Sequence, residues 1–448
     1  MRIALNKLLL LEAPEGGFTM DKDPHVVIVG GGFGGLNTAR GLARAPVRVT
    51  LVDKRNYHLF RPLLYQVATG LLSGDEIGAP LRSIFSRQRN IEVVMSEVNH
   101  IDTQNRLIKL PQYNLHYDFL VLATGITYNY FGHDEWKQIA PGIESLDDAD
   151  RIRGKILLPF ETAERMAAGS TADREMIQQL LTFVLVGAGT VGVEMASAMA
   201  EMMRVALARD FRHINPASAQ IILYEAATRI LPTFPEILSS KAHRHLEKLG
   251  VKIYTGTRVE SVDSEGVVVE GKRVPSQTII WCAGVVASPA ARWLSVETDR
   301  VGRVKVNPDL SVPRHPNIFA IGDTALVVAY SRNLLGMKTR TPAALPGVAQ
   351  PAIQEGRYVA DLIRRRVVGS LPPNPFVYWD RGDLAIVGRS FAVADLRFLR
   401  FSGFPAWLVW AAVHIYSLIG FANRLFVMLQ WAMSFLTKRR QVRIFPTH

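Results

Sequence analysis

The spacing of apolar residues predicts two copies of one strand–turn–helix–strand unit. The first copy has a short β-rich run at His25–Val29 and another at Val47–Val52. The second has Thr182–Val186, a helical periodicity over Val193–Val205, and a strand at Ile221–Tyr224. Short buried strands that alternate with amphipathic helices are typical of parallel sheets covered by helices. We therefore predict an α/β protein with two Rossmann-like domains.

The turn of each unit carries the pattern Gly-x-Gly-x-x-Gly. The glycines are Gly30, Gly32 and Gly35 in the first turn and Gly187, Gly189 and Gly192 in the second. Glycine permits the tight turn and lets the backbone approach a pyrophosphate at the helix N-terminus. Each second strand ends in an acid, Asp53 or Glu225, whose carboxylate can accept a hydrogen bond from a ribose hydroxyl. Two dinucleotide sites are therefore predicted, one for a resident cofactor and one for an exchanging cofactor.

The acid of the second unit bears on the choice of cofactor. A carboxylate at Glu225 repels a 2′-phosphate, so NADH is favoured over NADPH. Arg229 is close enough in sequence to soften this preference.

Charge and cysteine content narrow the class of protein. The chain has 448 residues with 52 Lys and Arg against 40 Asp and Glu, which gives a net charge of +12. This charge favours an anionic partner, and because no nucleic-acid-binding module is recognisable, we expect a membrane surface rather than a nucleic acid. The single cysteine, Cys282, excludes an internal disulfide and a dithiol redox centre. No metal site is predicted.

Further strands end in turns that could complete each domain. Tyr117–Ala123 leads into Thr124-Gly125, and Thr278–Trp281 leads into Cys282-Ala283-Gly284. Asn317–Ile321 ends in Gly322-Asp323. An acid at the carboxyl end of such a strand faces the cofactor crevice, although Gly-Asp is also an ordinary turn.

These motifs together resemble the flavoproteins with two dinucleotide-binding folds. The resemblance implies that the first cradle binds FAD, the second binds NAD(P)H, and the FAD domain is split by the inserted NADH domain. The FAD contacts it implies are Gly30, Gly32, Phe33, Gly34, Gly35, Asp53, Lys54, Ala123, Thr124, Gly125, Asp323, Ala349 and Gln350. The NADH contacts it implies are Gly187, Gly189, Thr190, Val191, Gly192, Glu225 and Gly284.

Two other segments resemble one branch of these flavoproteins. Tyr57–Gly70 and Pro346–Gly356 look like the flavin-flanking segment and the quinone motif of type II NADH dehydrogenases. Disulfide reductases and sulfide:quinone oxidoreductases share the outline but depend on cysteines that this chain lacks. The resemblance implies a hydride transfer from NADH to tightly bound FAD, and then electron transfer to a membrane quinone. The sequence places no polar pair in a bundle of membrane spans, so we predict no coupled ion pumping. Rival interpretations are a soluble NAD(P)H reductase with another acceptor and a redox-sensing flavoprotein.

The same resemblance implies which residues act on the quinone. The quinone contacts are Tyr65, Gln66, Ala349, Gln350, Gln354 and Arg381, and the catalytic residues are Glu194, Gln350 and Gln354. Pro351 suits a first helical turn, which places Gln350 at a helix start, where it is either a quinone donor or only a cap. Glu194 is either a proton relay or an acid favoured by the helix dipole. Arg381 stands where several relatives carry a lysine, and an arginine does not release its proton.

The C-terminal part is apolar and ends in cations. Phe404–Ala422 has no charged residue and the length of a membrane span, and Leu425–Leu436 is apolar again before a basic run. The alternatives are one span, two helices lying in one leaflet, or burial within the protein or a dimer. The resemblance favours the in-plane pair, and so a monotopic protein, and also a homodimer. The terminal cations suit anionic lipid, and the single cysteine fits the cytoplasmic face of the membrane.

The predicted division of the chain follows these motifs. Residues 1–23 form an N-terminal extension, residues 24–150 and 301–375 the two parts of the FAD domain, and residues 151–300 the NADH domain. Residues 376–448 form the membrane-anchoring region.

Overall fold

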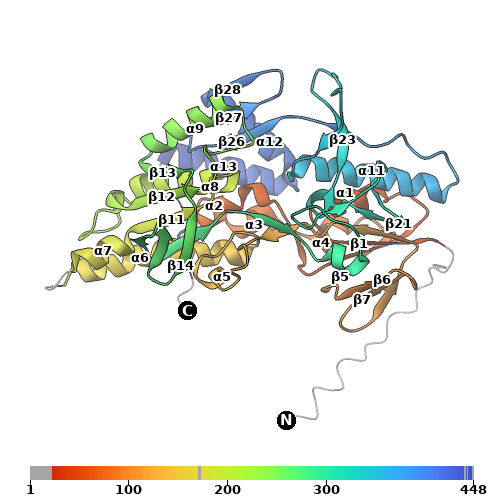
Figure 1. Ribbon diagram of the computed structural model, residues 1–448, viewed down its shortest axis with the longest axis horizontal. Helices are drawn as coiled ribbons and strands as arrows, with labels where there is room; N and C mark the ends of the chain where they lie inside the picture. Colours follow the sequence, from red (N-terminus) through yellow and green to blue (C-terminus); the bar gives the residue numbers. More distant parts are fainter. Residues whose placement is uncertain (1–22, 170–172, 438–439, 441, 446–448) are drawn as a thin grey trace, which may run out of the picture.

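The computed structural model describes residues 23–169, 173–437, 440 and 442–445. Nearly all of the predicted N-terminal extension lies outside these residues. Two α/β domains lie side by side, and a C-terminal unit covers both (Figure 1).

The first domain is built on a six-stranded sheet. Its order is β20 (Ser311–Val312), β21 (His315–Ala320), β9 (Phe119–Leu122), β1 (His25–Val29), β2 (Arg48–Asp53) and β5 (Ile91–Met95). All neighbours are parallel except β20 and β21. Strand β21 comes after the whole second domain in the chain, yet it pairs with β9. The first domain is therefore split by the second, which confirms the predicted fold class. The exact domain boundaries stay predictions.

The second domain repeats the arrangement with four parallel strands. Their order is β13 (Val251–Thr255), β12 (Gln220–Glu225), β11 (Thr182–Val186) and β17 (Thr278–Trp281). Helix α8 (Thr190–Glu201) follows β11 and continues into the π-helical turn η2 (Met202–Ala206). The domains are joined where β10 (Ile126–Tyr128) pairs antiparallel with β18 (Val285–Ala287).

Smaller elements surround the two sheets. Antiparallel strands are β3 (Tyr57–Leu59), β4 (Gly78–Pro80), β6 (His100–Asp102), β7 (Leu107–Lys109), β8 (Asn114–His116), β14 (Val259–Asp263), β15 (Gly266–Val269), β16 (Lys272–Pro275), β23 (Val328–Arg332) and β24 (Ala343–Ala344). The short parallel strands are β19 (Val304–Lys305), β22 (Ala325–Leu326) and β25 (Val377–Trp379). The remaining helices include α3 (Gly74–Ile77), α4 (Leu81–Phe85), α5 (Trp136–Ile139), α7 (Arg174–Leu180), α9 (Glu236–Lys248) and α10 (Ala290–Leu294).

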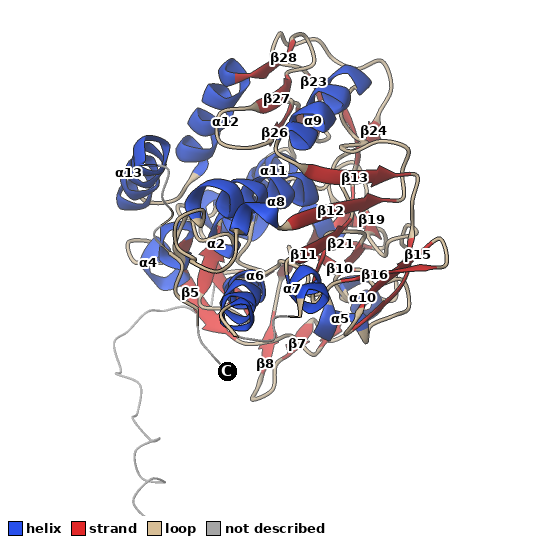
Figure 2. Ribbon diagram, turned by 90° about the vertical axis from the view of Figure 1, so that its left-hand side faces the viewer, coloured by secondary structure: helices blue, strands red, loops and turns tan. Residues whose placement is uncertain are grey.

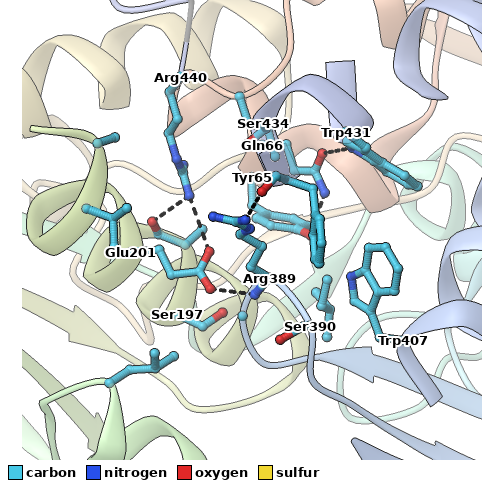
Figure 3. Close-up of a pocket in the computed structure, with 18 of the residues that line it drawn as sticks. Tyr65, Gln66, Ser197, Glu201, Arg389, Ser390, Trp407, Trp431, Ser434 and Arg440 are labelled. Atoms are coloured by element: carbon cyan, nitrogen blue, oxygen red, sulfur yellow. Dashed lines mark hydrogen bonds and ion pairs between the residues drawn. The ribbon is translucent and has the colours of Figure 1, made fainter. Parts of the chain in front are cut away.

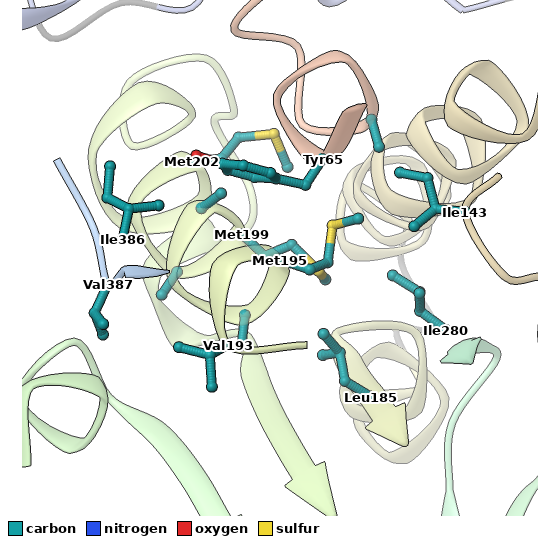
Figure 4. Packing of buried hydrophobic residues seen from close by; sticks show 14 of the residues in the cluster. Tyr65, Ile143, Leu185, Val193, Met195, Met199, Met202, Ile280, Ile386 and Val387 are labelled. Atoms are coloured by element: carbon teal, nitrogen blue, oxygen red, sulfur yellow. The ribbon is translucent and has the colours of Figure 1, made fainter. Parts of the chain in front are cut away.

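One continuous apolar core joins the two domains to the C-terminal unit. It contains residues of α2 (Leu64–Ala68), α6 (Leu146–Ala167), the second sheet and α8. Figure 4 shows Tyr65 of α2 packed beside Met199 and Met202, with Ile386 on the other side of α8. These side chains come from the first domain, the second domain and the C-terminal unit, so one shared apolar core holds the three parts together.

The C-terminal unit starts with a small sheet that the sequence pattern did not reveal. Its strands are β26 (Asp383–Ile386), β27 (Ala392–Asp395) and β28 (Arg400–Gly403), all antiparallel. The predicted membrane-anchoring region therefore includes a folded β-unit that packs on helix α12 and on the second domain.

Two apolar helices follow, α12 (Phe404–Ser417) and α13 (Phe421–Thr437). Figure 2 shows them along one edge of the molecule. The charge-free run is interrupted at Gly420, whose φ of +88° no helix accommodates. Within the part of the chain that the structure describes, no helix has both the length and the apolar character needed to cross a membrane.

Helices α1 (Phe33–Gly41) and α11 (Ala349–Val367) pack unusually closely. A Cβ added to Gly356 would lie 2.3 Å from the carbonyl oxygen of Gly34, and one on Gly41 would lie 2.5 Å from the Cβ of Ala360. This approach holds the helix of the first cradle against the helix of the quinone motif.

The substitution Gly356→Ala should therefore destabilise the protein by about 1–3 kcal/mol, because overpacking outweighs the gain in helix propensity. Gly154→Ala in α6 is the matched control, because its new Cβ would meet only Phe445 atoms, at 3.8–3.9 Å. Thermal unfolding followed by circular dichroism measures both. Equal melting temperatures for the two variants would contradict the proposed close packing.

Candidate functional site

The first glycine turn packs against the end of strand β9. Gly30 has a φ of +106°, and a Cβ there would lie 2.3 Å from the carbonyl oxygen of Ala123. A Cβ on Gly35 would lie 1.8 Å from the carbonyl oxygen of Gly30. Gly32 differs, because no described atom lies within 4 Å of its Cβ position and the residue is exposed. Two glycines thus permit the turn itself, and the third leaves backbone open to a phosphate.

The second turn has the same geometry. Gly187 has a φ of +100°, and its added Cβ would lie 2.7 Å from the Cα of Ala283. A Cβ added to Gly192 would lie 1.9 Å from the carbonyl oxygen of Gly187. A Cβ added to Gly189 would meet no described atom within 4 Å. The two cradles therefore fit two dinucleotide pyrophosphates.

The acid at the end of each second strand is bonded to its own cradle. Asp53 accepts the backbone N–H of Gly31 at 2.6 Å, and Glu225 accepts that of Ala188 at 2.6 Å. Carboxylates so placed retain lone pairs for ribose hydroxyls. Arg229 donates to the carbonyl of Pro232 at 3.0 Å, within its own loop. The guanidinium of Arg229, which could weaken the preference for NADH over NADPH, is thus bonded to the carbonyl of Pro232 instead.

A hydroxyl joins two separate motifs of the first domain. The Thr324 hydroxyl accepts the backbone N–H of Gly125 at 2.8 Å and lies 3.2 Å from the hydroxyl of Thr124. Burial raises the pKa of the neighbouring Asp323, and the positive charge of Arg61 partly opposes this rise. The predicted Ala-Thr-Gly and Gly-Asp motifs therefore meet at one place.

Two buried groups near the first cradle carried no separate signal in the sequence. Glu355 accepts the backbone N–H of Gly322 at 2.6 Å, and burial raises its pKa to about 7. His58 donates from Nδ1 to the carbonyl of Gly31 at 2.8 Å, and burial lowers its pKa to about 4. Its Nε2 has no hydrogen-bond partner among the described residues. This buried acceptor is consistent with a polar cofactor beside the turn. In contrast, Lys54 is exposed and Phe33 is half-buried.

The predicted quinone residues lie in three places. Ala349 and Gln350 form the first turn of α11 and are half-buried. Gln354 bonds the backbone of Trp379 with both ends of its amide, at 3.0 and 2.8 Å. Arg381 is exposed. Tyr65 and Gln66 are buried in α2, far from these residues in sequence and next to Glu194 of α8.

Glu194 is a buried carboxyl in an apolar setting. Its exposed fraction is 6%. Burial raises its pKa to about 8, and a hydrogen bond from the backbone of Ile386 opposes this only in part. Burial, and then the negative charge of Glu194, also raise the pKa of Tyr65. Glu194 is therefore mostly protonated at neutral pH, as a proton donor must be.

Beside these residues the structure contains a cavity of about 370 Å³ (Figure 3). It lies between α2, α8, the loop after β26 and the two C-terminal helices. Its apolar lining includes Trp407, Trp410 and Trp431, and its polar lining includes Tyr65, Gln66, Glu201 and Arg440. The indole N–H of Trp431 donates to Gln66 at 2.8 Å, and Gln66 donates to the Tyr65 hydroxyl at 2.8 Å. The cavity suits a flat, largely apolar molecule with a few polar atoms.

Cys282 lies beside the second cradle, and burial raises the pKa of its thiol to about 12. A thiol with so high a pKa is a poor nucleophile.

The chain matches a family model described as pyridine nucleotide-disulphide oxidoreductase over residues 24–356, and one described as NDH2 C-terminal domain over residues 380–440. It is 43% identical to the type II NADH:quinone oxidoreductase Ndh of Mycobacterium tuberculosis, over 93% of this chain and 89% of that protein. The chain belongs to the type II NADH:quinone oxidoreductases.

Other relatives agree with this assignment. NdhA of Mycobacterium tuberculosis, another type II NADH:quinone oxidoreductase, is 40% identical over 93% of this chain and 88% of its own length. The structure of NDH2 from Plasmodium falciparum superimposes with a TM-score of 0.82 at 20% identity, covering 93% and 99% of the two chains. As a type II NADH:quinone oxidoreductase, the protein is an FAD-dependent enzyme that oxidises NADH and reduces a quinone. The resemblance to type II NADH dehydrogenases is thus confirmed, and the interpretation as a redox-sensing flavoprotein is disfavoured.

The position of Glu225 gives a test of the second cradle. Glu225→Gln removes the charge that repels a 2′-phosphate, so the preference for NADH over NADPH should fall by roughly tenfold. Glu236→Gln, an exposed acid of the same domain, is the control. The ratio of kcat/KM for the two nucleotides is the measurement, and an unchanged ratio in Glu225→Gln would show that this acid does not select the cofactor.

Proposed function

We propose that FAD is held by the first cradle, that NADH binds at the second, and that the quinone is reduced beside Glu194 after entering through the cavity. The observation that carries this proposal is the position of α8. Its N-terminus forms the second cradle, and Glu194 lies in its first turns next to Tyr65, which lines the cavity. Bound FAD supplies the two-electron carrier between nicotinamide and quinone.

The chain's own groups account for the rest of this reaction. Asp53, Thr124 and Asp323 surround the first cradle and would hold and orient the cofactor, and Glu225 would bind the NADH ribose. Trp407, Trp410 and Trp431 give the cavity an apolar wall. Reduction of a quinone consumes two protons, and a carboxyl that is protonated at neutral pH can supply one of them.

The α11 residues have different proposed roles. Gln350 and Ala349 lie at the helix start, where the positive end of the dipole would stabilise negative charge on the reduced cofactor. Gln354 is already bonded on both sides by Trp379, so we propose that it fixes α11 to β25 and does not contact the quinone directly. Arg381 is exposed, and its role as a quinone contact stays a prediction.

The C-terminal helices are proposed to lie in one leaflet of the membrane at its cytoplasmic face. Their exposed apolar residues include Leu408, Tyr416, Phe421, Leu425, Phe426, Met428, Leu429, Met433 and Leu436. A face of this kind is typical of in-plane anchors, and the cations Lys438 and Arg439 that follow α13 in the sequence suit anionic lipid. A second copy of the chain is the alternative cover for this face, and the predicted homodimer is compatible with docking.

Glu194→Gln tests the proposed reduction site in stopped-flow absorbance. NADH should bleach the bound flavin at the wild-type rate, whereas short-chain ubiquinone should reoxidise it roughly a hundredfold more slowly, because the proton donor is lost. Glu161→Gln, an exposed acid on α6, is the control. Wild-type reoxidation in Glu194→Gln would contradict the role of this carboxyl.

The pH dependence provides a second readout of the same carboxyl. The pKa of Glu194 is raised to about 8, so its proton is present below that pH and is lost above it. The wild-type rate of flavin reoxidation should therefore fall as the pH rises through about 8. In Glu194→Gln this decline should disappear. A pH profile with the same decline in both proteins would assign it to another group.

Vesicle flotation tests the membrane proposal. Phe426→Gln and Leu429→Gln should each weaken binding to vesicles that contain anionic phospholipid by roughly tenfold, because an apolar side chain leaves the interface and no charge is added. Leu371→Gln is the control, because Leu371 is exposed and apolar but lies outside the C-terminal helices. If the two α13 variants float as the wild type does but have half its mass in analytical ultracentrifugation, this face is a dimer interface and not a membrane anchor.

A further inference from the structure

Arg440, three residues after the end of α13, contributes a buried cation to the wall of the cavity. The exposed fraction of Arg440 is only 7%. Its guanidinium donates to the carbonyl of Thr69 at 2.7 Å and to that of Ala198 at 2.9 Å, and lies 3.8 Å from a carboxylate oxygen of Glu201 (Figure 3). Arg440 therefore links α2, α8 and the C-terminal segment at one point.

Glu201 is held in place from the opposite side. Its carboxylate accepts the backbone N–H of Arg389, in the loop after β26. The preceding Gly388 has a φ of +102°, and a Cβ there would lie 2.9 Å from the same carboxylate oxygen. The loop thus has a backbone shape that leaves room for Glu201. Burial raises the pKa of Glu201, and the charges of Arg440 and Arg389 oppose this rise.

The segment that carries Arg440 is docked at further points. The backbone N–H of Val442 donates to the carbonyl of Gly70 at 3.2 Å, and a Cβ on Gly70 would lie 2.4 Å from the carbonyl oxygen of Val442. Arg153 donates to the carbonyl of Ile444 at 3.1 Å. Gly70 and Thr69 directly follow α2, the helix that carries Tyr65 and Gln66. The C-terminal segment is thus bonded to the residues directly after α2, whose Tyr65 and Gln66 also line the cavity.

We propose that Arg440 is a substrate-binding residue of the cavity, whose guanidinium donates a hydrogen bond to a carbonyl oxygen of the quinone, and that Glu201 is the residue that positions it. This inference rests on the proposed entry of the quinone through the cavity. A guanidinium has five N–H donors, and the carbonyls of Thr69 and Ala198 accept from only two of its nitrogens.

The chemistry of the cavity fits this assignment. A quinone offers a flat ring for Trp407, Trp410 and Trp431 and two carbonyl acceptors for polar groups. These oxygens gain negative charge as electrons arrive, and a desolvated cation stabilises that charge more strongly than a neutral donor does. Arg440 and Tyr65 both line the cavity and are its candidate donors to the two ends of one ring.

The test compares two arginines of the same segment. Arg440→Met removes the donor from the cavity, whereas Arg443→Met removes a contact with Asp210 that lies outside it. Arg440→Lys keeps the positive charge but lacks the planar guanidinium with its fixed set of N–H donors. The measurements are kcat and KM for short-chain ubiquinone with the FAD-loaded, full-length enzyme, and the rate at which NADH bleaches the flavin.

We expect the KM for ubiquinone to rise roughly ten- to a hundredfold in Arg440→Met, as for the loss of one charge-assisted hydrogen bond. Arg440→Lys should be intermediate, Arg443→Met should resemble the wild type, and NADH bleaching should be unchanged in all three. If Arg440→Met does not retain FAD, the double variant Arg440→Met/Glu201→Gln removes the unpaired buried carboxylate and is measured instead.

Two results would overturn the inference. One is an unaltered KM in the folded Arg440→Met or double variant, and the other is an equal rise in Arg440→Met and Arg443→Met, which would show that only docking of the segment matters. A wild-type enzyme that NADH bleaches but ubiquinone does not reoxidise is a separate result, because it would overturn the proposed function itself.

Discussion

The arrangement of the site depends on the burial of one helix. Every residue of α8 from Gly192 to Ala200 is buried, between the second sheet, α2 and the C-terminal strand β26. A helix enclosed on all sides normally has an apolar sequence, because each buried polar group requires compensation. Glu194 lies within this stretch and Glu201 at its end, each with a raised pKa. Because buried acids of this kind often belong to functional sites, they support the proposed role of α8 between the second cradle and the cavity.

Local chemistry made the two cradles predictable. A strand, a glycine turn, a helix and an acid follow one another within a short stretch of chain, and each has a distinct residue signature. The strands at His25–Val29 and Thr182–Val186 have the predicted bounds, and Asp53 and Glu225 both contact their turns. Backbone geometry near glycine depends on few neighbours, which is why a sequence motif can specify it.

Contacts between distant parts of the chain were not predictable in this way. Arg440 reaches Glu201 and Thr69 across hundreds of residues, and nothing near it in the sequence distinguishes it from the other cations of its basic run. The strands of the C-terminal sheet are short, so their periodicity is weak. The apolar run from Phe404 has the length of a membrane span, but the single glycine at 420 divides it into two helices. In each case tertiary structure decides between patterns that look alike locally.

The pairing of β10 with β18 has a consequence for how the enzyme can move. These strands are the two segments by which the chain leaves the first domain and returns to it, and hydrogen bonds hold them together over Ile126–Tyr128. Hinge bending normally concentrates in a few unpaired linker residues, and here both linkers are locked into one ribbon. A relative motion of the two domains therefore has to bend both strands of this ribbon together. The ribbon thus limits the directions in which the second domain can turn relative to the first.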